Sequence, residues 1–159
     1  MTAVWLVRAG EQSRHVRDFA RNGVIALGWP RVPGLGDLEG LDRDEIAGLI
    51  AVSGRTQTPA ADAGELLAFR DTMGIGDIVV TPDSTTNEVL IGHVTGGYEY
   101  LDPSPAGDYR HVRSTTWLGR WPRQEIPKEL LVELRYRRTI RQLTHQREWA
   151  AIADQLSTG

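Results

Sequence analysis

The sequence predicts a single α+β domain built on a small, strongly bent sheet with flanking helices. Its 159 residues, 40% of them hydrophobic and 25% charged, are enough for one globular core. Along the chain, the patterns follow one another as strand, helix, strand, two helices, a run of strands, and then helices. Because the strands gather in one run, the order favours α+β over an alternating doubly wound fold.

The N-terminal part is predicted to form a strand, a helix and a second strand. Residues 3–8 are β-prone and end at Ala9-Gly10. A helix is expected from about Glu11 to Arg21, closed by Asn22-Gly23, because both residues tolerate the left-handed backbone of a helix C-terminus. Residues 24–27 are apolar without alternation, which predicts a strand buried on both faces.

Two helices are expected next. Asp42 suits the N-cap position, and Glu45 completes a capping box for a helix that runs to about Val52. Pro59 is well placed at the first position of the following helix. Apolar residues recur there at helical spacing, namely Leu66, Phe69 and Met73.

A β-rich region follows these helices. Residues 77–82 and 88–95 are expected to form a hairpin joined by a polar loop. Gly96-Gly97 would suit a bulge or sharp bend of the kind that closes small barrels, and Tyr98–Tyr100 continue beyond it. A further strand from about Arg110 to Leu118 completes the predicted β framework.

The C-terminal part is predicted to be helical. One helix is expected from Pro127 to about Leu143, and a last amphipathic helix is marked by Trp149, Ile152, Ala153 and Leu156. We therefore predict a binding domain over residues 1–125. Helices over residues 126–159 would either pack on that domain or lead to a domain absent from this sequence.

Composition and the absence of certain motifs argue against several classes of protein. The chain has no cysteine, no apolar run long enough to span a bilayer and no basic leader at its start, so we expect a cytoplasmic protein with no membrane partner. No G-x-S-x-G or Walker-type motif occurs, and no metal-ligand spacing links the four histidines, His15, His93, His111 and His145. We therefore expect no enzyme activity, no cofactor and no metal.

Charge is segregated along the chain although its net value is only -3. Residues 1–109 hold 8 Lys and Arg against 16 Asp and Glu, whereas residues 110–147 hold 10 against 3. A local excess of this size attracts phosphates, although such arginines equally often solvate one face or pair with the acidic half. The candidate phosphate-binding residues are Arg8, Arg110, Arg120, Arg123, Arg138 and Arg141.

Aromatic side chains beside cationic ones suggest where a base could stack. Trp29 follows a buried strand at the mouth of a Gly- and Pro-rich loop. Because side chains alternate along a strand, one face is expected to hold His111, Arg113, Thr115 and Trp117. Rings and a guanidinium group would then lie together. The candidate ligand-binding residues are Trp29, Tyr98, Tyr100, His111, Arg113 and Trp117. The alternative is that Tyr98 and Trp117, like Trp5, only pack in the core.

Several segments together resemble a known family. They are Val4–Gly10, Asn22–Trp29, Gly76–Val80, Gly92–Tyr100, Arg110–Arg113 and Trp117–Gly119. In this order, over about residues 4–125, they resemble the N-terminal domain of Mrr-like restriction-system proteins, which is similar to EVE and YTH domains of the PUA-like superfamily. The resemblance implies a small bent β-barrel with flanking helices that binds nucleic acid and accommodates an extruded modified base.

The resulting hypothesis is a reader of modified double-stranded DNA that flips one base, as part of a restriction or defence system with a separate nuclease domain or subunit. An RNA-binding or small-nucleotide sensor module is the first alternative. A protein-interaction domain that uses the C-terminal helices is the second.

Overall fold

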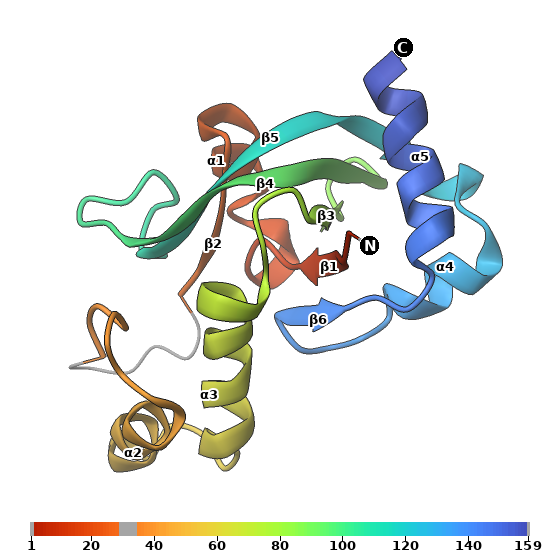
Figure 1. Cartoon of the computed structure of the whole chain (residues 1–159). Coiled ribbons are helices and arrows are strands. Elements are labelled where there is room, and N and C mark those ends of the chain that lie inside the picture. Colours follow the sequence, from red (N-terminus) through yellow and green to blue (C-terminus); the bar gives the residue numbers. More distant parts are fainter. Residues whose placement is uncertain (1, 29–34, 159) are drawn as a thin grey trace.

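A computed structural model describes residues 2–28 and 35–158, and within them the strands form one mixed sheet in the order β2-β5-β4-β3-β1-β6 (Figure 1). The strands are β1 (Val4–Val7), β2 (Val24–Leu27), β3 (Ile78–Asp83), β4 (Glu88–Tyr100), β5 (His111–Pro122) and β6 (Ile140–Gln142). β1 and β3 pair in parallel, and the other neighbouring pairs are antiparallel. The α+β class is therefore confirmed. The described strands form an open sheet with β2 and β6 at its edges, so they do not close the expected barrel.

Five α-helices accompany the sheet in the described part. They are α1 (Val16–Asn22), α2 (Arg43–Ser53), α3 (Pro59–Leu67), α4 (Lys128–Glu133) and α5 (Gln146–Thr158). Short turns of other helical types cover Glu11–Ser13, Ala68–Thr72 and Arg123–Glu125.

Local signals in the sequence set several of these helix boundaries as predicted. The Asp42 carboxylate accepts a hydrogen bond from the Glu45 N–H at 2.8 Å, and the Asp42 N–H donates to the Glu45 carboxylate at 3.2 Å. This is the expected capping box of α2. Pro59 begins α3, and Gly23 ends α1 with a φ of 64°.

The β4–β5 ribbon is long, and its register shifts between Val94 and Tyr98, which confirms the bulge expected at Gly96-Gly97. A second shift follows Ile91. At Gly92 a Cβ atom would lie 2.4 Å from the Thr116 carbonyl oxygen, so only glycine permits this close approach. The two irregularities bend the ribbon (Figure 1).

The helix predicted from Pro127 to about Leu143 is wrong over most of its length. α4 ends at Glu133, and β6 pairs antiparallel with β1. The Arg8 N–H donates to the Thr139 carbonyl at 2.9 Å, and the Leu143 N–H donates to the Val4 carbonyl at 2.7 Å. Because the edge of β1 would otherwise leave backbone groups unpaired, these distant contacts outweigh local helix propensity.

The helix predicted from Glu11 to Arg21 is interrupted at its start. Gln12 and Ser13 have φ values of 54° and 57°, which an α-helix does not contain. Regular helix begins only at Val16.

Apolar side chains on the two faces of the sheet form two cores. Along β1, Trp5 and Val7 pack with α1, α2 and α3, whereas Val4 and Leu6 pack with α4 and α5. Trp149 of α5 is fully buried in the second core. Residues 126–158 therefore add a strand to the sheet and two helices to one of its faces.

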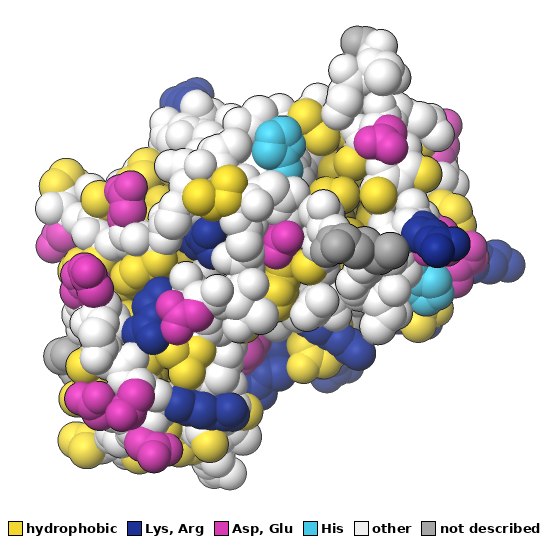
Figure 2. Space-filling view, in the orientation of Figure 1, with side chains coloured by type: hydrophobic (Ala, Val, Ile, Leu, Met, Phe, Trp, Pro, Cys, Tyr) yellow, Lys and Arg dark blue, Asp and Glu magenta, His cyan; other side chains and the backbone are white. Residues whose placement is uncertain are grey.

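The surface reflects the segregation of charge. Figure 2 shows Asp and Glu side chains over the α2 end of the molecule and Lys and Arg side chains near β6. In the described part, no helix has the length and apolarity needed to cross a bilayer.

Candidate ligand pocket

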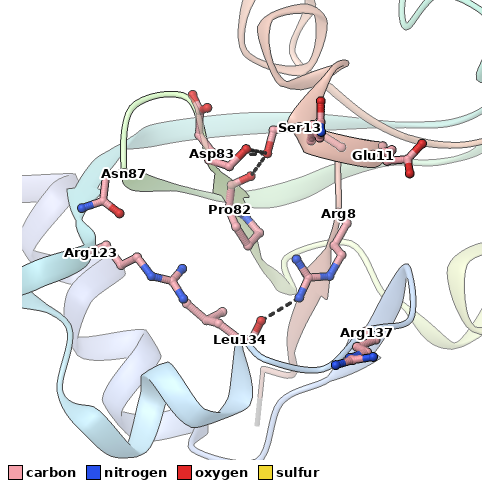
Figure 3. Close-up of a pocket in the computed structure, with 13 residues that line it drawn as sticks. Arg8, Glu11, Ser13, Pro82, Asp83, Asn87, Arg123, Leu134 and Arg137 are labelled. Atoms are coloured by element: carbon pink, nitrogen blue, oxygen red, sulfur yellow. Dashed lines mark hydrogen bonds between the residues drawn. The ribbon is translucent and has the colours of Figure 1, made fainter.

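Four segments far apart in the sequence surround a pocket with a volume of about 560 Å³ (Figure 3). They are residues 8–13 after β1, the β3–β4 turn over residues 82–87, Arg123 after β5, and Leu134 with Arg137 after α4. We call this site the Arg8 pocket. Its volume lies inside the range of about 300–1,000 Å³ that is usual for small-ligand sites.

The segment that follows β1 has an unusual backbone. Gly10 has a φ of 84°, and a Cβ atom there would lie 3.0 Å from His15 and 3.2 Å from the Tyr109 hydroxyl. Gln12 and Ser13 follow with positive φ values, a conformation that costs non-glycine residues on the order of 1–3 kcal/mol. Such strained residues persist where surrounding contacts fix them, and they often occur at functional sites.

Ser13 supplies the contacts that fix this segment. Its hydroxyl donates to the Pro82 carbonyl at 3.2 Å and accepts from the Ser84 N–H at 3.0 Å. The strained turn is therefore attached to the β3–β4 turn, and the two together form one wall of the pocket (Figure 3).

Arg8 is half-buried, and its guanidinium donates hydrogen bonds to backbone carbonyls, which are neutral. Its Nη2 donates to the Leu134 and Tyr136 carbonyls, each at 2.6 Å, and its Nε donates to the Tyr136 carbonyl at 3.1 Å. Burial lowers the pKa of Arg8, and the positive charge of Arg123 lowers it further. Since carbonyl groups orient a guanidinium without neutralising it, Arg8 keeps its positive charge in the pocket.

Arg123 and Arg137 complete a cluster of three arginines. Among the described residues, no hydrogen bond or ion pair engages either of these two guanidinium groups, and both residues line the pocket. The lining also holds two carboxylates, of which Glu11 is exposed at the surface. Guanidinium groups gathered without counter-ions repel one another, and a bound anion relieves the repulsion.

Asp83 does not neutralise this cluster, because it already has a partner of its own. Its carboxylate lies 2.8 Å from Arg120 Nη1 and accepts from the Thr85 N–H at 2.9 Å. Burial alone would raise the pKa of Asp83, but the hydrogen bonds from Thr85 and Arg120 outweigh it and hold the pKa below its usual value. The pocket therefore remains positively charged and suits a phosphate, which arginine binds in a bidentate manner.

Two of the six predicted phosphate-binding residues, Arg8 and Arg123, lie in this pocket. The other four have positions elsewhere. Arg110 lies 3.5 Å from Asp102, Arg120 pairs with Asp83, Arg138 pairs with Asp62 at 2.5 Å and Glu65 at 2.6 Å, and Arg141 stacks over Tyr136 at 4.2 Å. The charge of Arg138 is thus compensated by the buried Asp62 and the half-buried Glu65.

Of the predicted ligand-binding rings, Tyr98, Tyr100 and His111 lie at the other end of the β4–β5 ribbon. Tyr100 pairs with His111 in the register, whereas Glu88 pairs with Pro122 at the end beside the pocket. Tyr98 and His111 stack with ring centroids 5.9 Å apart. These rings form a cluster of their own and do not line the Arg8 pocket.

Tyr98 and His111 are tied to each other by a hydrogen bond of 2.8 Å between Oη and Nδ1. Burial raises the pKa of Tyr98 to about 12 and lowers the pKa of His111 to about 4. The Tyr98 hydroxyl accepts from the Leu38 N–H at 3.1 Å, so it donates to the neutral imidazole. The pair thereby anchors the loop before α2.

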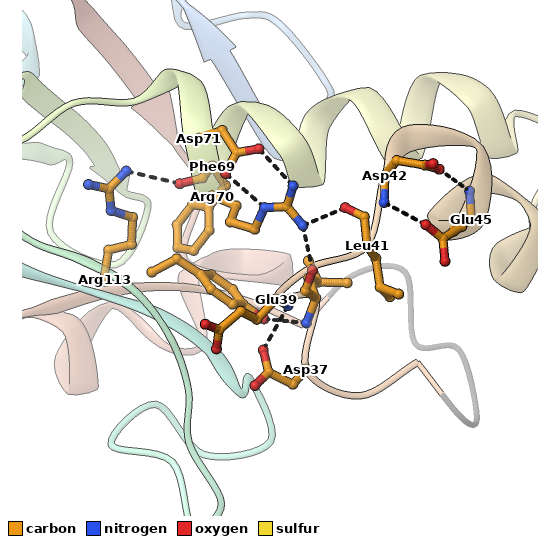
Figure 4. Close-up of polar contacts among 11 residues, drawn as sticks. Asp37, Glu39, Leu41, Asp42, Glu45, Phe69, Arg70, Asp71 and Arg113 are labelled. Atoms are coloured by element: carbon orange, nitrogen blue, oxygen red, sulfur yellow. Dashed lines mark hydrogen bonds and ion pairs between the residues drawn. The ribbon is translucent and has the colours of Figure 1, made fainter.

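Arg113 has a structural role that the sequence did not indicate. It is only 3% exposed, and its guanidinium donates to the Phe69 carbonyl at 3.1 Å (Figure 4). It also donates to the carbonyls of Gly96 at 3.0 Å and of Met73. The guanidinium therefore holds the β4 bulge against the turn after α3. It does not face the Arg8 pocket.

Of the two predicted tryptophans, the structure describes only Trp117. Trp117 is half-buried against the core, and its indole N–H donates to the Phe19 carbonyl at 2.7 Å. Trp29 lies outside the described residues. In the part of the chain that the structure describes, no group of three side chains is arranged to hold a metal ion.

Some residues of the pocket were not predicted from the sequence. Arg137 lies in the basic segment, but the helix assigned to that segment gave no reason to single it out. Ser13, Ser84 and Asn87 lie in turns, and only the positive φ values of Ser13 and Asn87 mark them as unusual. No pattern in the sequence indicates that backbone conformation.

The fold and the pocket define the chain as an α+β domain with an arginine-lined pocket. It belongs to the family described as "Domain of unknown function (DUF8426)", whose profile matches residues 5–144 and so spans β1 to β6. No curated protein matches the chain. Among solved structures, it is similar to the crystal structure of protein Atu2648 from Agrobacterium tumefaciens at 12% identity and a TM-score of 0.43, covering 98% of this chain and 93% of the other.

Proposed function

We propose that this domain binds nucleic acid and that the Arg8 pocket holds a phosphate-bearing nucleotide of it. The observation that carries the proposal is the cluster of Arg8, Arg123 and Arg137 around one cavity, with no carboxylate partner for Arg123 or Arg137 among the described residues. Arginine is the side chain best suited to bidentate recognition of phosphate.

The remaining lining supports a nucleotide rather than a simple inorganic anion. A volume of about 560 Å³ exceeds what one phosphate group needs and is of the size that accommodates a small organic ligand. Ser84 and Asn87 lie at the surface of the β3–β4 turn and supply hydrogen-bonding groups. Such groups fix the orientation of a ligand whose charge is held by arginine.

The finer proposal is that the domain is PUA-like and reads a modified base in double-stranded DNA, for a restriction or defence system with a separate nuclease. Its support is the resemblance of residues 4–125 to the N-terminal domain of Mrr-like proteins. The described lining of the pocket contains no aromatic ring. Base stacking stays with Trp29 as the sequence suggests, where a ring contributes about 1–3 kcal/mol per base.

Titration by fluorescence anisotropy tests the proposal. The probes are labelled DNA duplexes with and without modified bases, labelled RNA and free nucleotides, each at two salt concentrations. The variant R123A/R137A should bind the preferred polymer more weakly and, because one phosphate contact is lost, reduce the slope of log K against log salt by about 1. Arg55→Ala is the matched control, because Arg55 is exposed and lies outside the pocket.

Two results would contradict the proposal. If R123A/R137A binds every probe as tightly as the parent, the pocket does not hold the phosphate. If Trp29→Ala distinguishes modified from plain DNA as well as the parent does, the base is read elsewhere. A preference for RNA or for free nucleotides would favour the sensor alternative.

A further inference from the structure

A second pocket lies on the other side of the β3–β4 turn. It has a volume of about 460 Å³ and is lined by Arg17 and Arg21 of α1, by Arg120, and by Asp83, Thr85 and Thr86 of the turn. We call it the Arg17 pocket. Asp83 lines both this pocket and the Arg8 pocket, so the two cavities share one wall.

Arg17 and Arg21 are exposed and lie four residues apart on the same face of α1. No hydrogen bond or ion pair of either guanidinium is found among the described residues. Like charges at this spacing destabilise a helix slightly. A pair of guanidinium groups one helical turn apart is therefore better explained by an anion that both contact.

The wall between the pockets does not repel an anion. The Asp83 carboxylate is only 3% exposed and is paired with Arg120, which also lies 3.7 Å from Glu88. Above this pair, the exposed part of the turn consists of Ser84, Thr85, Thr86 and Asn87, whose side chains are uncharged. A negatively charged strand crossing the turn would meet hydroxyl and amide groups.

The Ser13 hydroxyl connects the two sites through the backbone. It attaches the turn before α1 to the β3–β4 turn by accepting from the Ser84 N–H at 3.0 Å. α1 begins three residues later, so Arg17 is held beside the same turn that forms a wall of the Arg8 pocket. The spacing between the two arginine clusters is thus fixed by the fold.

We propose that the two pockets form one groove for a sugar–phosphate backbone. The β3–β4 turn lies between the sites of two neighbouring phosphates. Arg8, Arg123 and Arg137 hold one phosphate, and Arg17 with Arg21 holds another. This inference rests on the proposed function and deepens it, because it makes the ligand a polynucleotide instead of a single nucleotide.

The test compares R17A/R21A with the parent, R123A/R137A and Arg55→Ala. Each protein is titrated with short labelled single-stranded DNA, duplex DNA, RNA and a labelled nucleoside monophosphate. For the oligonucleotides, R17A/R21A loses one phosphate contact and should therefore reduce the slope of log K against log salt by about 1. Its affinity for the monophosphate should equal that of the parent, whereas R123A/R137A should weaken both. The DNA and RNA arms decide which polymer supplies the backbone.

Failure of this inference differs from failure of the proposed function. If oligonucleotide binding depends on Arg123 and Arg137 but R17A/R21A keeps the parent slope, the groove is refuted and the Arg8 pocket stands. A monophosphate that binds as tightly as the oligonucleotides also refutes the groove. If the parent binds no probe, both proposals fall. Because Arg17 and Arg21 are exposed, unchanged thermal unfolding of the variant should show that its fold is intact.

Discussion

Replacing Glu133 by Gln should destabilise the domain through the junction of α4 and α5. One carboxylate oxygen of Glu133 accepts from the Thr144 N–H at 2.8 Å and lies 2.8 Å from His145 Nδ1. The other accepts from the Trp149 indole N–H at 2.9 Å. Gln keeps the shape of the side chain but removes its charge, so it mimics the protonated acid.

The magnitude follows from the pKa of this carboxyl group. Burial alone would raise the pKa of Glu133, but hydrogen bonds from Thr144, Trp149 and His145 outweigh it and lower the pKa from 4.5 to about 2. The side chain is only 11% exposed. The difference in pKa corresponds to about 3 kcal/mol of folding free energy at neutral pH. For a chain of this length, that loss lowers the Tm by about 6–12 °C.

The pH dependence has a definite sign. Because the folded pKa of Glu133 is lowered, its contribution is complete above the ordinary value of 4.5 and is lost as the pH falls toward 2. Its carboxylate raises the pKa of His145, whose contribution is complete below the ordinary value of 6.5 and is lost as the pH rises through the folded pKa. The difference between parent and variant should therefore be largest between pH 4.5 and 6.5.

Denaturant unfolding of both proteins across this pH range provides the measurement, with the exposed Glu125→Gln as control. Taking the difference between parent and variant cancels the separate titration of His111. A loss that stays constant from neutral pH down to about pH 3 would refute the reasoning, because the lowered pKa of Glu133 requires it to decline there.

Two further substitutions test the interior and the pocket wall. Arg113→Met should cost about 3 kcal/mol in denaturant unfolding, because it leaves three backbone carbonyls without their donor; a loss below about 1 kcal/mol would show that they find other partners. Gly10→Ala should cost about 1–3 kcal/mol and weaken oligonucleotide binding, since its φ is 84° and a Cβ atom would crowd His15. Gly40→Ala is the control, because its φ of 79° carries similar strain but nothing lies within 4 Å of the added atom. Equal binding by both glycine variants would contradict a role for the Gly10 backbone in the pocket.

Elements with strong local signals were predictable from the sequence. The capping box of Asp42 and Glu45, the proline that begins α3 and the glycine pair in β4 each act within a few residues of themselves. Their physical effect is therefore visible in a short stretch of sequence.

Contacts between distant segments were not predictable in this way. β6 forms because it pairs with the edge of β1. Within residues 134–143 alone, no sequence pattern distinguishes that strand from the end of a helix. The same limit applies to barrel closure. A bulge was correctly located, but whether the sheet closes depends on which strands meet at its edges.

The candidate site was predictable only in its charge. Arg8 and Arg123 were both among the predicted phosphate-binding residues, and the pocket adds Arg137 from the same basic segment as Arg123. Strand alternation correctly grouped His111, Arg113 and Thr115, all of which are buried. Alternation predicts which residues share a face of the strand, but it does not predict whether that face points into the core. Arg113 was therefore expected at a ligand site, whereas it is buried in the interior.

The carbonyls that hold the Arg8 guanidinium belong to the link between α4 and the sheet-edge strand β6. Loosening β6 from β1 would therefore release the side chain that a ligand needs, and a ligand on that side chain would strengthen the attachment of β6. By thermodynamic reciprocity, detachment of β6 from β1 weakens ligand affinity by the same factor by which a bound ligand disfavours that detachment.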